Sequence, residues 1–316
     1  MRIVISNKSK NYHIYHKITW RLILGFFISM LIVSCKNNSS VSILEGSEEF
    51  NGQNAYNHIE YLTELGPRTI NSKAHSETEI WIQNQLNDSG IKTEILSNNG
   101  TIPITNIIGK IGQGKPVILL GTHYDSRLLA DKDPLIENRS KPVIGANDGA
   151  SGTAILIELA RLLAKMNSSS PIKGSIWIVF FDAEDNGNIS NYDWILGSRL
   201  FQNQINEKPD MVVIIDMLGD KDLNIFQEKN SDGQLNQEIW EVAKLLNYEQ
   251  YFVKDQKYSI LDDHTPFLDA GIPAVLLIDF DYRYWHTTED TIDKISSESL
   301  KIVGNTIFNW LQLKIK

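Results

Sequence analysis

Cysteine is almost absent from this sequence of 316 residues, and the one that occurs is Cys35. A chain with a single cysteine can form no internal disulfide, so packing or a bound metal has to stabilise the fold. Proline is sparse as well, with nine residues, and the hydrophobic content is 42%. These values are typical of a globular protein with a substantial core.

Basic residues are too few for a nucleic-acid-binding protein. The net charge is −9, and residues 1–35 contain five basic residues and no acidic one, so the remainder of the chain carries −14. Binding to a phosphate backbone requires a basic face. We therefore predict no nucleic-acid partner.

The apolar run 22–33 is too short to span a bilayer comfortably, which takes about 20 residues. Positive charges up to Arg21 precede it, and this layout is typical of a secretory signal. The following Ile32-Val33-Ser34-Cys35 resembles a bacterial lipobox, in which the cysteine is lipidated and becomes the new N-terminus. We predict a signal peptide over residues 1–35 and an exported protein, held at the bacterial cell envelope by lipidated Cys35. An uncleaved signal anchor is the alternative.

The rest of the chain predicts a polar tether followed by one α/β domain. Residues 36–53 are rich in Ser, Asn and Glu, as in a flexible linker. From residue 54 to 316, strands alternate with helices without a linker or repeat, which favours a single three-layer domain with a mostly parallel central sheet between helices. We expect a monomer. The predicted strands are 91–96, 104–111, 116–121, 176–181, 211–215 and 274–278. The predicted helices are 54–65, 74–86, 150–166, 194–201, 233–246, 266–270 and 295–313.

One stretch, SIWIVFFDAEDNG at residues 175–187, changes abruptly from apolar to acidic. Its run from Ile176 to Phe181 has no polar face and suits a strand buried on both sides. Asp182, Glu184 and Asp185 follow directly. Carboxylates crowded at the tip of a buried strand are costly to desolvate unless a cation lies among them. A solvated acidic turn is the alternative.

Histidine and carboxylate residues follow four of the predicted apolar strands. In open parallel sheets, ligands bind at the carboxyl ends of the strands. Four strand ends that each change from hydrocarbon to such residues are hard to explain as solvated turns. The residues concerned are His123 and Asp125, Glu184 and Asp185, Asp216, and His286, with Asp148 at the start of a helix.

Three of these residues also have ordinary structural explanations. Asp148 precedes Gly-Ala-Ser and could cap the helix that follows. His123 could be a hydrogen-bonded histidine at a strand end. His286 lies in the segment Tyr-Trp-His-Thr-Thr, where an aromatic cluster alone would indicate packing. His58 and His75 are interpreted as ordinary residues of the early helices.

A mixed set of histidine and carboxylate ligands without thiolates fits zinc with one open position. The neighbours Glu184 and Asp185 suit such a site, because adjacent side chains of an extended backbone point to opposite sides. One of them can bind the metal while the other serves the reacting group as general acid or base.

The same residues carry a resemblance to the zinc aminopeptidase superfamily, and two further motifs resemble its glutaminyl-peptide cyclotransferases. The aminopeptidases usually have Ser-Asp-His where this chain has Asp262-Asp263-His264. The resemblance covers roughly residues 54–316. Its motifs are His123-Tyr124-Asp125-Ser126, Asn147 to Gly152, Phe181 to Asp185, Leu196 to Arg199, Asp216, Asp262 to Leu268, Gly271-Ile272-Pro273 and Trp285-His286-Thr287.

The resemblance implies a role for each matching residue. Asp148, Asp185 and His286 would be the zinc ligands, and Glu184 the general acid/base. Asp216 and Asp262 would form a hydrogen-bonded acidic pair. The substrate pocket would include Trp285, Trp194 and His264, while His123 and Asp125 would lie near the metal, as ligands only of a second ion. In two departures, Asp185 stands where animal members have Glu, and Leu276 where some members carry a second histidine.

The implied reaction is the zinc-dependent conversion of N-terminal glutamine of peptides or proteins into pyroglutamate with release of ammonia. One zinc ion is expected. The alternative is an aminopeptidase with two zinc ions, bound by His123, Asp148, Asp185, Asp216 and His286, in which Glu184 activates water. A binding lipoprotein without catalytic activity would lack a ligand or the base, and the sequence lacks neither.

Overall fold

The computed structural model describes residues 50–316 except 101 and 191. The predicted signal peptide, Cys35 and most of the predicted tether lie outside the described residues and stay predictions. Helix α1 (Gly52–Glu64) begins two residues before the predicted domain boundary at 54. Phe50 is 1% exposed and packs against Gly304. Residues 50–53 are therefore part of the fold and not of the tether.

A mixed, mostly parallel sheet of six strands forms the centre of the domain. Its strands are β1 (Thr93–Asn99), β2 (Pro103–Gln113), β3 (Val117–His123), β4 (Gly174–Phe181), β5 (Met211–Asp216) and β8 (Ala274–Ile278), in the spatial order β1-β2-β4-β3-β5-β8. The pairs β1–β2 and β2–β4 are antiparallel, whereas β4, β3, β5 and β8 run parallel. The predicted fold class is confirmed.

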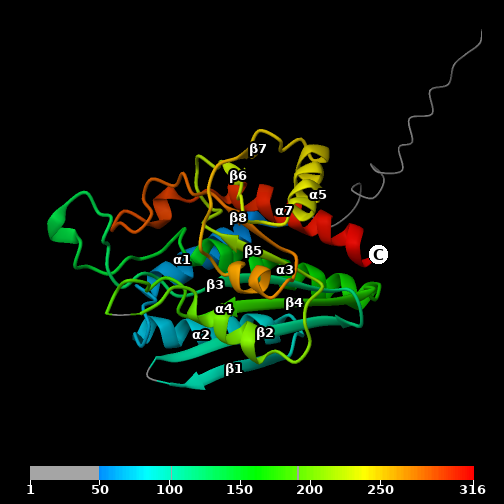
Figure 1. Ribbon diagram of the computed structural model, residues 1–316, viewed down its shortest axis with the longest axis horizontal. Helices are drawn as coiled ribbons and strands as arrows, with labels where there is room; N and C mark the ends of the chain where they lie inside the picture. Colours follow the sequence, from blue (N-terminus) through cyan, green and yellow to red (C-terminus); the bar gives the residue numbers. More distant parts are fainter. Residues whose placement is uncertain (1–49, 101, 191) are drawn as a thin grey trace, which may run out of the picture. The chain divides into compact units, whose positions relative to one another are not determined.

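Helices cover both faces of this sheet (Figure 1). Alternation along β3 supplies both cores, since Ile118 and Leu120 pack into one and Val117 and Leu119 into the other. Strands β3, β4 and β8 are buried at every residue, as expected for strands covered on both sides. The first face carries α1, α2 (Lys73–Asp88), α3 (Ala150–Ser169), α5 (Gly233–Leu245) and α7 (Ser297–Ile315), and the second carries α4 (Leu196–Gln204) and α6 (Thr265–Asp269).

Four short elements were not predicted from the sequence. Strands β6 (Ile225–Gln227) and β7 (Phe252–Gln256) pair in parallel as a separate two-stranded sheet, and two 3₁₀ turns lie at Ile136–Asn138 and Ile292–Lys294. These elements combine short length with mixed polar and apolar residues, so they show neither a periodic pattern nor a continuous apolar run. Within the described part of the chain, no helix is long and apolar enough to cross a membrane.

His75 joins α2 to the end of β4 through a buried ion pair, although we interpreted it as an ordinary helix residue. Its Nε2 lies 2.7 Å from Asp182 Oδ1, and its Nδ1 lies 3.2 Å from Glu79 Oε1. The other oxygen of Asp182 accepts a hydrogen bond from the Thr105 backbone N–H at 2.8 Å. Asp182, the first of the three carboxylates after β4, is therefore a structural partner of α2 and β2.

Replacing His75 by Gln should lower the free energy of unfolding by about 1.5–3 kcal/mol at pH 6 and by less at pH 9. Burial alone would lower the pKa of His75, but the hydrogen bond and charge of Asp182 raise it above its usual value. The charged pair therefore stabilises the fold fully below the unfolded pKa of about 6.5, and this contribution is lost as the pH rises through the folded pKa. Denaturant titrations at both pH values measure the difference.

The matched control is Lys73→Gln, which removes an exposed ion pair with Glu77 on the same helix. This change should alter the free energy of unfolding by less than about 1 kcal/mol at either pH. Equal losses at pH 6 and pH 9 in the His75 variant would contradict the assignment of a charged pair.

Candidate metal centre

Asp148, Asp185 and His286 converge at the carboxyl end of the sheet. One ligand atom from each lies within 4.8 Å of the others, and all three residues are 1–3% exposed. The His286 Nε2 is 2.9 Å from Asp185 Oδ1 and 3.6 Å from Asp148 Oδ2. The three residues come from the start of α3, the end of β4 and the segment after β8. The structure thus brings together the three predicted metal ligands.

These three residues fit a zinc ion. Asp148 Oδ2 and Asp185 Oδ2 are buried and have no hydrogen-bond partner. Burial and the nearby Asp148 charge raise the pKa of Asp185 to about 6. Unpartnered carboxylate oxygens in a buried site are costly, and a divalent cation would satisfy both of them. Two carboxylates and one imidazole without a thiolate are a donor set that zinc accepts.

Asp148 owes its position to a glycine and not to a capping role. The residue that caps α3 is Gly149, with φ +86, and no side chain caps this helix. A Cβ atom at Gly149 would lie 2.4 Å from the Asp125 carbonyl oxygen, so only glycine allows the close approach of α3 to the end of β3. The alternative that Asp148 serves as a helix cap is wrong.

A second group shares Asp148 and consists of His123, Asp148 and Asp216. The His123 Nε2 lies 3.0 Å from Asp216 Oδ1 and 3.1 Å from Asp148 Oδ1, and its Nδ1 lies 3.4 Å from Asp125 Oδ1. Burial alone would lower the pKa of His123, but the carboxylates of Asp216, Asp125 and Asp148 raise it well above its usual range. Without a second metal, these carboxylates thus favour a protonated imidazole at His123.

Asp216 Oδ1 lies 3.0 Å from His123 Nε2, and Asp216 and Asp262 line the same cavity. The predicted hydrogen bond between the two carboxyl groups requires a proton on one of them, and it stays a prediction. The two carboxyl groups still interact through space. Burial raises the pKa of Asp216 to about 7, and the Asp262 charge adds to this rise against the opposing effect of His123.

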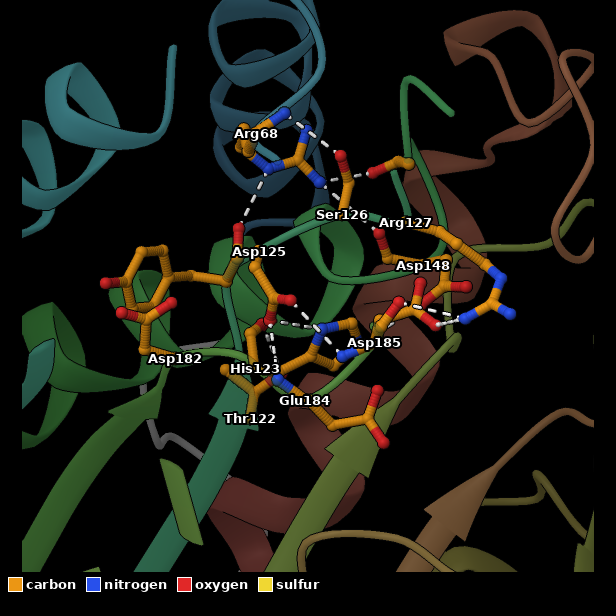
Figure 2. Close-up of polar contacts among 12 residues, drawn as sticks. Arg68, Thr122, His123, Asp125, Ser126, Arg127, Asp148, Asp182, Glu184 and Asp185 are labelled. Atoms are coloured by element: carbon orange, nitrogen blue, oxygen red, sulfur yellow. Dashed lines mark hydrogen bonds and ion pairs between the residues drawn. The ribbon is translucent and has the colours of Figure 1, made fainter. Parts of the chain in front are cut away.

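Asp125 holds the turn that carries Glu184 and Asp185. Its Oδ1 accepts the Glu184 backbone N–H at 3.1 Å, and its Oδ2 accepts the Asp185 backbone N–H at 3.2 Å. Ala183, the residue before Glu184, has φ +53. This unfavourable backbone conformation is maintained by the two hydrogen bonds to Asp125. As a result, the side chains of Glu184 and Asp185 diverge, while Asp182 points away from both (Figure 2).

A cavity of about 270 Å³ opens beside the three ligands, and Glu184 lines it. The Glu184 carboxyl group has no hydrogen-bond partner among the described residues, so it is available to a bound molecule. Burial raises its pKa well above the usual range, and the charges of Asp185, Asp262 and Asp263 add to this effect. The lining residues are Asp148, Glu184, Asp185, Trp194, Asp216, Met217, Tyr258, Ser259, Ile260, Leu261, Asp262, Ile278, Phe280, Trp285 and His286.

His264 is one predicted pocket residue that does not line this cavity. It is completely buried, and its Nε2 lies 3.3 Å from Glu228 Oε2. Glu228 in turn accepts hydrogen bonds from the backbone N–H groups of Asn230, Ser231 and Ile260. His264 therefore joins α6 to the loop after β6 and does not form part of the cavity wall, so its predicted role in substrate binding has no support from this cavity. The predicted pocket residues Trp194 and Trp285 do line the cavity.

Comparison with known proteins gives the family. The family model described as peptidase family M28 matches residues 106–311, which is more than half of the chain. The chain belongs to peptidase family M28.

The proteins that are similar to this M28 chain in sequence or structure include both glutaminyl cyclases and an exopeptidase. The glutaminyl cyclase of Tannerella forsythia is 32% identical, with a TM-score of 0.77 over 84% of this chain and 99% of that one. A Zn-dependent exopeptidase from Parabacteroides distasonis is 29% identical, with a TM-score of 0.77 over 83% and 97%. The glutaminyl-peptide cyclotransferase of the snake Boiga irregularis is 29% identical, and the match covers 66% of this chain and 66% of that protein, just under two thirds.

Two buried charges that hold Asp148 in this M28 chain were missed in the sequence. Arg68 is 0% exposed and donates to the backbone carbonyls of Tyr124, Ile144, Gly145 and Asp148 at 2.7–3.3 Å (Figure 2). Asp290, also 0% exposed, accepts the backbone N–H groups of Asn147 at 2.8 Å and Asp148 at 3.1 Å. No sequence signal marks either residue, because burial of a charge depends on distant segments.

Arg127 is a third residue that sequence reasoning left without a role. It donates to the Asp185 carbonyl oxygen at 3.0 Å and to Asp185 Oδ1 at 3.4 Å, and its guanidinium lies 4.8 Å from the centre of the Trp194 ring. It also forms two hydrogen bonds with Asp131, at 2.7 and 3.1 Å. Arg127 thus links a predicted metal ligand to the wall of the cavity.

Proposed function

We propose that this protein converts the N-terminal glutamine of peptides or proteins into pyroglutamate with release of ammonia, in a reaction that depends on one zinc ion. The observation that supports this most directly is the difference between the two candidate metal groups. Beside His286, the Oδ2 atoms of Asp148 and Asp185 are buried without a hydrogen-bond partner, and the cavity opens next to them, whereas His123 Nε2 contacts both Asp148 Oδ1 and Asp216 Oδ1 in the second group. One metal ion at the first group would lie next to a substrate held in this cavity.

The cavity suits a short neutral side chain. Trp194, Trp285 and Phe280 supply aromatic walls, and Ile260 and Ile278 add aliphatic ones. The volume of about 270 Å³ accommodates one side chain and its backbone but not a long peptide segment. Substrate would therefore enter by its N-terminal residue, with the rest of the chain outside. The printed names of the Tannerella and Boiga proteins support the same reaction.

Zinc held by Asp148, Asp185 and His286 would act as a Lewis acid on the γ-carbonyl group of the substrate glutamine. Glu184 takes a proton from the α-amino group, whose nitrogen then attacks the side-chain carbonyl carbon. A new C–N bond forms, the C–N bond to the amide nitrogen breaks, and Glu184 returns its proton to the leaving ammonia. Burial raises the pKa of Glu184, which favours retention of the proton on Glu184 until it passes to the leaving ammonia.

Nucleophile and electrophile belong to the same substrate residue, so correct folding of that side chain is a large part of the catalysis. The rings of Trp194 and Trp285 both stack with that of His286: their centroids are 6.1 and 3.8 Å from that of the imidazole. A glutamine side chain held beside these rings would be restricted near the metal ligands. Asp262 lines the same cavity and is placed to accept a hydrogen bond from the substrate amine.

Hydrolysis of N-terminal residues by a two-zinc aminopeptidase is the second candidate. One observation favours it: His123, Asp148 and Asp216 have metal-ligand separations, and they share Asp148 with the first group. The printed name of the Parabacteroides protein points the same way. A second metal would have to displace the proton that the neighbouring carboxylates favour on His123, because a histidine must be neutral to bind a metal.

One experiment separates the two candidates. The purified protein with its bound metal is offered a peptide that begins with glutamine and, separately, a chromogenic amide of leucine. We expect ammonia release and a product 17 mass units lighter (the mass of NH₃) from the first, and about one metal ion per chain. Release of the chromophore from the leucine amide, with two metal ions per chain, would overturn the cyclase proposal.

A further inference from the structure

The loop between β3 and α3 passes beside His286 at residues 131–133, a segment that we name the strap. Four contacts join the strap to the segment His286–Thr288. Asp131 Oδ1 lies 3.5 Å from His286 Nδ1, and the Lys132 backbone N–H donates to the His286 carbonyl oxygen at 3.2 Å. Asp133 Oδ2 accepts both the backbone N–H of Thr288 at 2.9 Å and its hydroxyl at 2.6 Å. The backbone of His286 is thus hydrogen-bonded to the strap, and its buried Nδ1, which has no hydrogen-bond partner, lies within ion-pair distance of Asp131.

His286 needs such support because its backbone has φ +55, in the left-handed region. A residue with a Cβ atom adopts this conformation only when its surroundings enforce it. The turn that contains it is closed by the Thr287 hydroxyl, which donates to the Tyr284 carbonyl oxygen at 2.7 Å, and by the strap. Without the strap, the imidazole would lose the contacts that fix its direction toward Asp148 and Asp185.

Asp133 is the fixed point of the strap. It is 1% exposed and accepts four hydrogen bonds. Its Oδ1 accepts the Leu135 backbone N–H at 2.9 Å and the Asn138 amide at 3.2 Å, while its Oδ2 accepts the two donors of Thr288. Asn138 also donates to the Thr288 hydroxyl at 3.2 Å. A carboxylate that is satisfied on both oxygens holds the loop and the His286 segment in one relative position.

Asp131 adds a charge beside the imidazole. With His286 Nε2 directed toward Asp148 and Asp185, its Nδ1 faces the Asp131 carboxylate. A carboxylate next to the distal nitrogen of a ligating histidine fixes the tautomer and makes the other nitrogen a stronger ligand. Asp131 is itself held by Arg127 through two hydrogen bonds.

We propose that Asp131, Asp133 and Thr288 are positioning residues that orient His286 for metal binding, so that metal affinity depends on a loop that supplies no ligand. This inference rests on the zinc site of the proposed function, and it makes no assumption about the substrate. Among the three ligands, the strap contacts only His286 directly, since Asp148 is held by Arg68 and Asp290, and Asp185 is linked to Asp131 only through Arg127.

The test compares Thr288→Val with Thr288→Ser in the full protein. The valine variant loses the hydroxyl bonded to Asp133 at nearly the same side-chain volume, and the serine variant keeps it. We expect zinc to bind about tenfold more weakly to the valine variant and within about twofold of wild type to the serine variant. The dissociation constant is measured by competition with a chromophoric chelator, without any substrate. Asp133→Asn should weaken binding at least as much.

Glu137→Gln is the control on the same loop, because Glu137 is exposed and makes no hydrogen bond or ion pair within the described part of the chain. Unchanged zinc affinity in Thr288→Val and Asp133→Asn would overturn the proposal, as would an equal loss in Thr288→Ser. A lower unfolding midpoint of the metal-free variants with unchanged zinc affinity would show a purely structural role. If Asp133→Asn does not fold, the Thr288 pair carries the test. Since no turnover is measured, failure here leaves the cyclase proposal untouched, and absence of cyclase activity leaves this measurement valid.

Discussion

Replacing Glu184 by Gln should lower the turnover of glutamine cyclisation by about 10²–10⁴-fold and leave the zinc content unchanged. The amide has nearly the same shape as the carboxyl group but cannot accept the proton of the α-amino group or return one to ammonia. Zinc remains because Glu184 is not among the three converging ligands and its side chain points away from Asp185 (Figure 2). Turnover is measured by ammonia release, and metal by elemental analysis of the same sample.

The KM for the peptide distinguishes this role from a role in binding. A group that acts on the proton in the transition state should change kcat far more than KM. Glu137→Gln again serves as the matched control, since it makes the same chemical change on the exposed part of the loop after β3. Near-wild-type turnover in Glu184→Gln would remove Glu184 from the reaction and with it the proposed mechanism.

The central sheet could be predicted from the sequence because its strands are covered on both sides. Residues 176–181 and 274–278 are continuous apolar runs, and every residue of β4 and β8 is buried. Such runs leave little choice of conformation. The small sheet of β6 and β7 could not be predicted, because its strands have three and five residues and β7 ends in exposed polar residues.

The convergence of Asp148, Asp185 and His286 was also predictable, since the topology of a parallel sheet brings strand ends to one edge. The hydrogen bonds and ion pairs among the residues next to these three ligands could not be predicted. The sequence places Asp216 and Asp262 in the same region, but it does not show that His123 Nε2 lies 3.0 Å from Asp216 Oδ1. The contact of His264 with Glu228 could not be predicted for the same reason, because the two residues are 36 positions apart in the chain and no local pattern connects them.

The buried supports of the site are the least predictable part. Arg68 follows a Gly-Pro stop after the first helix, where a charged residue is normally solvated, yet it contacts four backbone carbonyls around Asp148. Its partners lie 56–80 residues away in the chain. Side chains that act through distant backbone groups leave no periodic or local pattern, so reasoning from strand ends finds the ligands and misses what orients them.

Removal of the metal with a chelator should abolish cyclisation, with a loss of at least about 10³-fold, because a Lewis acid supplies several kcal/mol to the transition state. One equivalent of zinc per chain should restore full turnover, and a second equivalent should add nothing. The reason is that the two candidate metal groups differ in the contacts of their carboxylate oxygens. The Oδ2 atoms of Asp148 and Asp185 have no hydrogen-bond partner, whereas His123 Nε2 already contacts Asp216 Oδ1 and Asp148 Oδ1.

The variant His123→Gln tests the number of zinc ions that the protein binds per chain. If the imidazole supplies the second positive charge, the variant should still bind one zinc ion per chain. Its stability should fall, because Asp216 and Asp125 lose their charged partner.

If His123 is instead a metal ligand, wild type should bind two ions and the variant one. A fall in stoichiometry from two to one would therefore contradict the one-zinc site and favour the aminopeptidase, and an unchanged value of one would exclude His123 as a ligand. Because the count of ions needs no substrate, it separates the two reactions even where both activities are weak.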